Sequence, residues 1–215
     1  MKKIASPLFQ DLSEAELDTL AAAGHLRTRQ FAKHEVIFRA GSCVREIGIV
    51  LRGSVHIENL DLWGTKSILS SVGAGQAFAE TYAFCGEALM VDAVAAEHCE
   101  ILFLHTAAFT DARIEPALQD KLLRRLLAVS MRKNLSLSQR IFCTTPKTVR
   151  GRLLTYFSAQ AARCGRMEFE VPFNRQQMAD YLNLDRSALS KELCKCGTKV
   201  CWNLIKPLCL KQLPE

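Results

Sequence analysis

The sequence predicts an α+β protein with an N-terminal antiparallel β-roll of the jelly-roll type, then a long helix and a C-terminal helix-turn-helix. Three observations support this fold class. Short runs of β-forming residues, punctuated by glycines, occupy residues 26–105. A stretch without glycine or proline follows at 117–143. Two short helical patterns joined by a tight turn then lie within 174–194.

The composition limits the domain number, the partners and the location that we expect for this protein. The 215 residues suit one large domain or two small ones, and 49% hydrophobic residues are ample for a core. A net charge of +6 and a pI near 8.9 are compatible with a polyanionic partner. No apolar run is long enough to span a bilayer and the start lacks a signal-peptide core, so we expect a cytoplasmic protein without a membrane segment. The nine irregularly spaced cysteines are interpreted as thiols.

The first element is a short helix, and strands follow it. Ser13 and Glu16 have the spacing of a capping box, which predicts a helix through about Ala23. One helical turn at Ala79–Cys85 is expected to interrupt the sheet. The predicted strands are Leu26–Phe31, Glu35–Phe38, Glu46–Leu51, Ser54–Glu58, Ser67–Val72, Met90–Ala95 and Cys99–His105.

The long helix is predicted over 117–143. Thr106 is expected to cap a connecting helix that Pro116 interrupts. Because the long helix exceeds what one side of a small β-domain covers, we expect it to pair with a second copy; a linker helix lying on its own domain is the alternative. Apolar residues recur along it at a spacing of three and four, as on one side: Leu118, Leu122, Leu126, Val129, Leu135 and Ile141.

The C-terminal part begins with a helix predicted from Thr145-Pro146 to about Cys164, where Gly165 ends it. The alternation in Met167–Val171 predicts a strand. The next helix is capped by a box formed by Asn174 and Gln177. The apolar residues of the two helices in the pair are expected to be Met178, Tyr181 and Leu182 in the first, and Ala188, Leu189 and Leu193 in the second.

The turn and the second helix contain the residues that indicate a function. Asn183 suits a left-handed turn, and Asp185 can cap the second helix. The outer face of that helix is polar, as insertion into the major groove of DNA requires. An ordinary helical hairpin is the alternative. The polar residues are Arg186, Ser187, Ser190 and Lys191.

Two segments resemble the Crp/Fnr family of bacterial transcription regulators. Residues 173–182 with 185–190 are similar to the DNA-binding motif of the family, and 49–55 resemble the strand–glycine–strand signature of its cyclic-nucleotide-binding-like domain. The resemblance implies an effector domain at 1–115, a dimerisation helix at 116–143 and a winged helix-turn-helix domain at 144–215. It also implies a homodimer on a palindromic operator in double-stranded DNA, contact with RNA polymerase, and allosteric control by one effector.

The same resemblance assigns DNA-binding roles. Arg186, Ser187 and Lys191 would face bases, while Arg175 and Ser190 would touch phosphate. Ser187 stands where cAMP-responsive members carry an acidic residue, so the operator should differ from theirs.

The expected effector pocket departs from the family pattern. Phe78, Ala79 and Glu80 match the segment in which cAMP-binding members have a Gly-Glu pair for the ribose. Ten residues after Glu80, where those members bind the cyclic phosphate through Arg and Ser or Thr, this chain has Met90 and Val91. A cyclic phosphate would lose its bidentate positive partner, which argues against cAMP.

The identity of the effector stays open. Residues 1–42 contain no cysteine, which argues against an iron–sulfur cluster, and nothing indicates haem or metal-ligand spacing among the five histidines. Cys85, beside the expected pocket, and Cys43, in an early loop, are either sensing thiols or small buried hydrophobic residues. The chain contains no paired catalytic residues, phosphate-binding loop or nucleophile motif, so an enzyme is not expected.

The tail at 195–215 does not match the expected wing, which has the pattern Met-x-x-x-Gly-x-Leu. A back-translation read from the third base of the Lys195 codon encodes Met-Arg-Asp-Glu-Gly-Val-Leu-Glu, which matches it in register. The hypothesis is a frameshift that replaced the wing; a genuinely divergent tail is the alternative. An altered wing supports a second hypothesis for the function, in which the chain is an effector-binding module whose DNA-binding domain is inactive.

Overall fold

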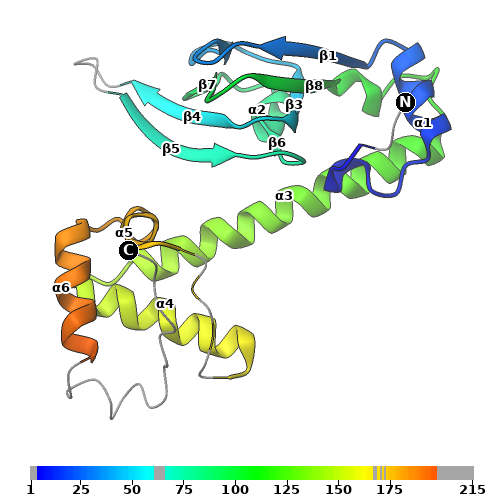
Figure 1. The fold of residues 1–215 in the computed structure, drawn as a ribbon. Helices are drawn as coiled ribbons and strands as arrows, with labels where there is room; N and C mark the ends of the chain where they lie inside the picture. The colour runs from blue at the N-terminus through cyan, green and yellow to red at the C-terminus, as the bar shows by residue number, and fades with distance from the viewer. Residues whose placement is uncertain (1–3, 61–65, 167–168, 170, 172, 198–215) are drawn as a thin grey trace. The chain divides into compact units, whose positions relative to one another are not determined.

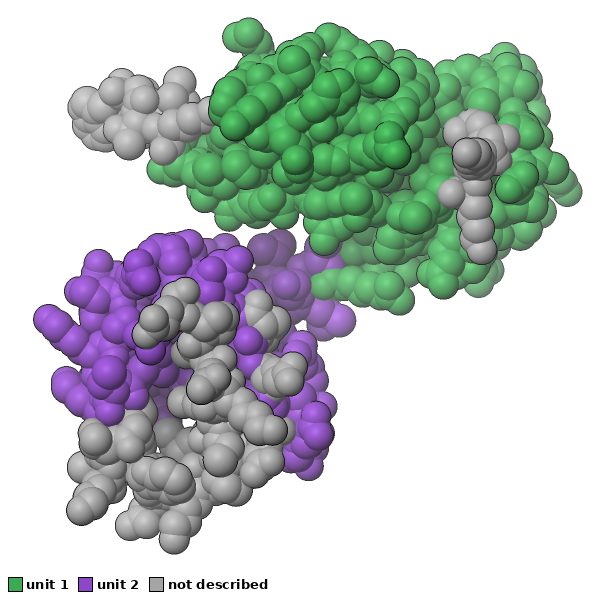
Figure 2. Space-filling view, in the orientation of Figure 1, with its two compact units in different colours: residues 1–132 green, residues 133–215 purple. Residues whose placement is uncertain are grey.

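The computed structural model describes residues 4–60, 66–166, 169, 171 and 173–197. The chain forms two compact units, residues 1–132 and 133–215, which Figure 2 colours separately. None of the helices in the described ranges is both long enough and apolar enough to cross a membrane.

The first unit contains an antiparallel sandwich of two four-stranded sheets (Figure 1), which confirms the predicted β-roll. All seven predicted strands are present within two residues of their expected bounds. The eighth, β6, was missed because two residues are too short to show alternation. One sheet has the order β1 (Leu26–Phe31), β8 (Cys99–His105), β3 (Glu46–Arg52) and β6 (Ala77–Phe78); the other has β2 (Val36–Phe38), β7 (Asp92–Ala95), β4 (Val55–Leu60) and β5 (Lys66–Val72).

Aromatic side chains fill the space between the sheets. The ring of Phe38 packs 5.7 Å from that of Phe78 and 5.6 Å from that of Phe103, measured between centroids. A Cβ on Gly48 would lie 2.2 Å from the Phe78 ring, so this strand position requires glycine. Glycine is required at position 53, in the signature segment, for two reasons: its φ is +83°, and a Cβ would lie 2.6 Å from the backbone oxygen of His98.

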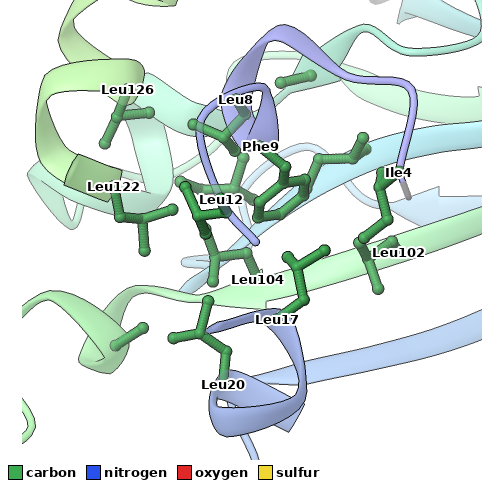
Figure 3. Packing of buried hydrophobic residues seen from close by; sticks show 14 of the residues in the cluster. Ile4, Leu8, Phe9, Leu12, Leu17, Leu20, Leu102, Leu104, Leu122 and Leu126 are labelled. Atoms are coloured by element: carbon green, nitrogen blue, oxygen red, sulfur yellow. The ribbon is translucent and has the colours of Figure 1, made fainter. Parts of the chain in front are cut away.

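A second core joins the N-terminal helices to the sandwich and to the long helix. η1 (Pro7–Phe9) and α1 (Glu14–Ala22) precede the first strand, and the predicted capping box of Ser13 and Glu16 is present. Figure 3 shows Leu122 and Leu126 of the long helix packing among the leucines of this N-terminal segment. Helix α2 (Glu80–Cys85) follows β6, where a single helical turn was predicted.

The long helix α3 spans Pro116–Thr144. Pro116 begins it and does not interrupt a helix, because proline lacks only an N–H that the first turn leaves unbonded anyway. The segment before it is the 3₁₀ helix η2 (Thr106–Phe109), and its cap is His105, not Thr106. The Nδ1 of His105 accepts a hydrogen bond of 3.0 Å from the backbone N–H of Ala107.

The apolar residues of α3 form two faces, so the prediction of one side was wrong. Leu118, Leu122 and Leu126 are buried against the protomer's own domain, whereas Leu135 and Ile141 are 70% and 66% exposed. We call the other side the exposed stripe; its residues are Leu123, Leu127, Met131, Leu135, Leu137, Ile141 and Phe142. The N-terminal half therefore lies on its own domain, as the alternative interpretation expected.

Among its described residues, the second unit has three further helices. α4 (Val149–Cys164) begins three residues later than predicted, because the side chain of Thr148 accepts the N–H of Gly151 and caps it. Gly165 ends it with a φ of +63°, as expected. α5 (Arg175–Leu182) and α6 (Arg186–Gly197) follow. Part of the predicted strand at 167–171 and the tail from 198 onward lie outside the described residues.

Candidate functional site

Local hydrogen bonds define the pair of helices α5 and α6. The Asn174 side chain accepts the N–H of Gln177 at 2.8 Å, and the Gln177 side chain accepts the N–H of Asn174 at 2.9 Å. This is the predicted capping box. Asn183 ends α5 in the left-handed region with a φ of +54°, as predicted. Residues 183–185 thus form the tight turn between the helices.

The inner faces of both helices are buried on α4. Met178, Leu182 and Leu189 are fully buried in one cluster with Tyr156 of α4. Burial raises the pKa of Tyr156 to about 12, so its phenol stays uncharged. Because one face of each helix is fixed in this core, the opposite face of α6 points to solvent.

Asp185 caps α6 and constrains Ser187. One carboxylate oxygen of Asp185 accepts the N–H of Ser187 at 2.8 Å, the N–H of Ala188 at 2.9 Å and the hydroxyl of Ser187 at 2.5 Å. The Ser187 hydroxyl and the backbone N–H of Ala188 hold the pKa of Asp185 below its ordinary value. Because the Ser187 hydroxyl already donates its proton to Asp185, its oxygen can take part in a further hydrogen bond only as an acceptor.

Four of the five residues predicted to bind DNA come together on α6. Arg186, Ser187 and Lys191 are exposed, and Ser190 is half-buried beside them. The fifth, Arg175, begins α5 and is half-buried, and its Nε has no hydrogen-bond partner among the described residues.

The turn is held by two arginines that sequence reasoning missed, which we call the arginine pair. Arg140 of α3 donates to the carbonyl oxygens of Asp180 at 2.9 Å and Tyr181 at 3.0 Å. Arg152 of α4 donates to those of Leu182 at 3.1 Å and Asn183 at 2.7 Å. Four successive carbonyls at the end of α5 thus have a cationic partner, where a helix leaves carbonyls unbonded and its dipole favours positive charge. No spacing in the sequence signals this, since the arginines lie 30 to 41 residues away.

The residues expected at the effector pocket lie around the start of α2. Phe78 is buried in the aromatic core and Glu80 is 5% exposed. Ala79 between them has a φ of +61°, the left-handed conformation that a glycine adopts without strain. The backbone at this position therefore has a conformation that favours glycine, although the residue is alanine.

The other expected pocket residues are dispersed. Met90 is 77% exposed, and Val91 is half-buried. Cys85 and Glu80 line a groove of about 200 Å³ between α2 and α3, which we call the α2–α3 groove. Its remaining lining residues are Thr81, Phe84, Leu123, Leu126, Leu127 and Ser130.

The cysteines in question are not buried. Cys43 and Cys85 are both exposed free thiols, so the interpretation as small buried hydrophobic residues is wrong for them. It describes Cys99 and Cys143, and burial raises the pKa of the Cys143 thiol.

Comparison with known proteins identifies the first domain. Residues 28–113 match the family model of the cyclic nucleotide-binding domain. Among solved structures, the chain is similar to the catabolite activator protein of Thermus thermophilus, with 25% identity and a TM-score of 0.50 over 89% of this chain and 87% of that one. A search of curated protein sequences gave no match.

Two further structures show the same fold at lower identity. FixK2 of Bradyrhizobium japonicum is 18% identical with a TM-score of 0.52, over 81% of this chain and 85% of that one. A putative cAMP-binding regulatory protein of Silicibacter pomeroyi is 21% identical with a TM-score of 0.50, over 90% and 84%. Residues 28–113 therefore match a cyclic nucleotide-binding domain, and the chain has the fold of solved structures that include a catabolite activator protein and FixK2.

Proposed function

We propose that the chain is a sequence-specific DNA-binding transcription regulator of the Crp/Fnr type, controlled by an effector other than cAMP. The observation that carries the proposal is the outer face of α6, where Arg186, Ser187 and Lys191 are exposed at the end of the helix next to a rigidly held turn. A helix presented in this way fits the major groove as the recognition helix of a helix-turn-helix. The similarity to a catabolite activator protein over most of both chains supports the same function.

Each residue on this face has a defined chemistry. Arg186 can donate two hydrogen bonds to one guanine, which is worth about 1–3 kcal/mol of discrimination against other bases. Ser187 acts as an acceptor because its proton is held by Asp185, so it suits the amino group of cytosine or adenine. Lys191, one turn further along the same face, faces the next base or phosphate. Arg175 and Ser190 contribute phosphate contacts that set register.

The exposed stripe of α3 supports a homodimer. Large apolar residues on one side of a helix lose contact with water when a second copy packs there. A two-fold dimer would present two recognition helices to half-sites of a palindromic operator about 34 Å apart, one turn of DNA. Contact with RNA polymerase is part of the proposal through the family resemblance alone.

The proposed effector pocket retains Glu80 and lacks a partner for a cyclic phosphate. At the positions where an arginine would bind it, the structure has the exposed Met90 and the half-buried Val91. Effector binding beside Ala79 and Glu80 would bias two arrangements of the dimer, only one of which suits the operator.

The test is selection of bound sequences from random duplex DNA with the full chain. We expect a palindrome with half-sites one turn apart. In Arg186→Ala one base position should lose its preference, with affinity reduced about 5- to 150-fold, the equivalent of 1–3 kcal/mol. Lys195→Ala is the matched control: it removes a positive charge from the last turn of α6 and should leave the recovered motif unchanged.

Recovery of no motif, with only weak salt-sensitive binding, would refute the proposal and favour an effector-binding module with an inactive DNA-binding domain. Repeating the selection with the wing pattern restored at 195–215 separates a lost wing from a domain that does not read DNA.

A further inference from the structure

We propose that Asp185 is a positioning residue that determines specificity: it fixes Ser187 as a hydrogen-bond acceptor, so that the base facing Ser187 must present an exocyclic amino group. This inference rests on the proposed function and specifies it further. Asp185 need not touch DNA, yet it determines which chemical group one position of the operator must carry.

The backbone of α6 holds one carboxylate oxygen of Asp185 in place. This oxygen accepts the N–H of Ser187 at 2.8 Å and the N–H of Ala188 at 2.9 Å. The Asp185 carbonyl accepts the N–H of Leu189 at 2.9 Å, the first backbone bond of the helix, and Leu189 is fully buried in the core. The carboxylate therefore has a fixed position relative to Ser187.

The Ser187 hydroxyl donates to the same carboxylate oxygen at 2.5 Å. A hydroxyl has one proton, so this bond uses the only donor of the side chain. The Ser187 hydroxyl and the Ala188 N–H lower the pKa of Asp185, which keeps it ionised at neutral pH and makes the bond charge-assisted. Rotating the hydroxyl toward DNA would exchange this bond for a weaker one to a neutral base.

The four bases differ in what they present to such an acceptor. In the major groove, adenine and cytosine carry an amino group that donates, whereas guanine and thymine carry a keto oxygen that accepts. An unconstrained serine can bond to either kind, because its hydroxyl can donate or accept. With its proton held by Asp185, Ser187 can bond only to the amino group. A keto oxygen at the same place would face a second acceptor with no proton between them.

The residue before Ser187 has the opposite polarity. Arg186 is exposed and carries only donors, which suit the two acceptors of guanine. Adjacent residues of α6 thus present a donor and an acceptor. This combination predicts a half-site that pairs a guanine with a base that has an amino group.

The experiment compares the full chain with three variants by selection of bound sequences from random duplex DNA. Ser187→Ala identifies the base position that Ser187 reads, because the preference at that position is lost. Asp185→Gly removes the carboxylate but keeps a residue that begins helices well. Asp185→Asn is the matched control, since its amide oxygen can accept the same hydrogen bonds without the charge.

In the wild-type chain, we expect adenine or cytosine at the Ser187 position to be preferred to guanine or thymine by roughly tenfold. Asp185→Asn should keep this preference. Asp185→Gly should reduce it to about twofold or less, because the freed hydroxyl bonds to either kind of base, while the guanine preference assigned to Arg186 is unchanged. A merely structural loss would weaken both positions together.

A second measurement modifies the DNA and so does not depend on the folding of a variant. Methylation of the amino nitrogen replaces the hydrogen that points into the major groove. An operator with N6-methyladenine or N4-methylcytosine at the Ser187 position should bind the wild-type chain roughly tenfold more weakly. The same modification just outside the recovered motif should have no effect, and Ser187→Ala should bind the methylated and unmethylated operators equally.

Three results would overturn the inference and leave the proposed regulator intact: a preference for guanine or thymine at the Ser187 position, an unchanged preference in Asp185→Gly, or equal binding of the wild-type chain to methylated and unmethylated operators. A Ser187→Ala variant that changes no base position would do the same. Recovery of no motif at all would overturn the proposed function, and the inference with it.

Discussion

Replacement of Arg152 by methionine tests whether the arginine pair fixes the turn between α5 and α6. The change removes three hydrogen bonds from a cationic donor: those to Leu182 and Asn183, and one of 2.8 Å to Pro146. Methionine keeps most of the aliphatic volume, so the loss of packing is small.

The magnitude follows from the burial of these bonds. A hydrogen bond to a charged group is worth about 1.5–3 kcal/mol, and less where water can replace the donor. The bonds to Leu182 and Pro146 are half-buried and the one to Asn183 is exposed. Allowing about 1 kcal/mol for each half-buried bond and little for the exposed one gives a loss of about 2 kcal/mol in the free energy of opening α5 and α6.

Amide hydrogen exchange measured by mass spectrometry is the assay. A loss of 2 kcal/mol corresponds to exchange about 30-fold faster in peptides from residues 175–190. Arg132→Met is the control, since Arg132 is an exposed arginine of α3 whose replacement should change stability by less than about 0.5 kcal/mol. If exchange in 175–190 accelerates no more in Arg152→Met than in this control, water satisfies those carbonyls and the arginine does not hold the turn.

Three further predictions concern local features. Asn174→Ala should lower the free energy of unfolding of the second unit by about 1 kcal/mol, whereas Asn174→Gly should cost only a few tenths, measured by urea denaturation; equal costs would contradict a capping role. Ala79→Gly should stabilise the first unit by about 1 kcal/mol in the same assay, because removing the backbone strain of a left-handed alanine outweighs the added entropy of the unfolded chain. A loss of stability would refute this reasoning. Asn134 lies in the middle of the exposed stripe, and its side-chain oxygen accepts a hydrogen bond of 3.4 Å from the Ser138 hydroxyl. Asn134→Leu should tighten self-association and produce species larger than a dimer in sedimentation velocity. An unchanged dimer would exclude a role of Asn134 in the register of the paired helices.

Features that depend on near neighbours were predictable from the sequence. The capping boxes at Ser13 and Asn174 form with residues three positions away, so their patterns alone determined where α1 and α5 begin. Strand positions followed from alternation between glycines, and Asn183 determined the turn through its own conformational preference. The polar outer face of α6 could be predicted because the apolar Leu189 indicates which side of the helix packs into the core. The structure buries that side, so the polar side faces solvent.

Features that depend on distant residues were decided only by the tertiary structure. The sequence could not divide the apolar residues of α3 into two faces, because which leucines are buried depends on how the N-terminal segment packs on them. It could not show that Cys85 is exposed, nor that Phe84 and Leu127 border one groove. The arginine pair is the clearest case: a guanidinium can reach any backbone carbonyl that the fold brings near, so its partners follow from packing and from no local pattern.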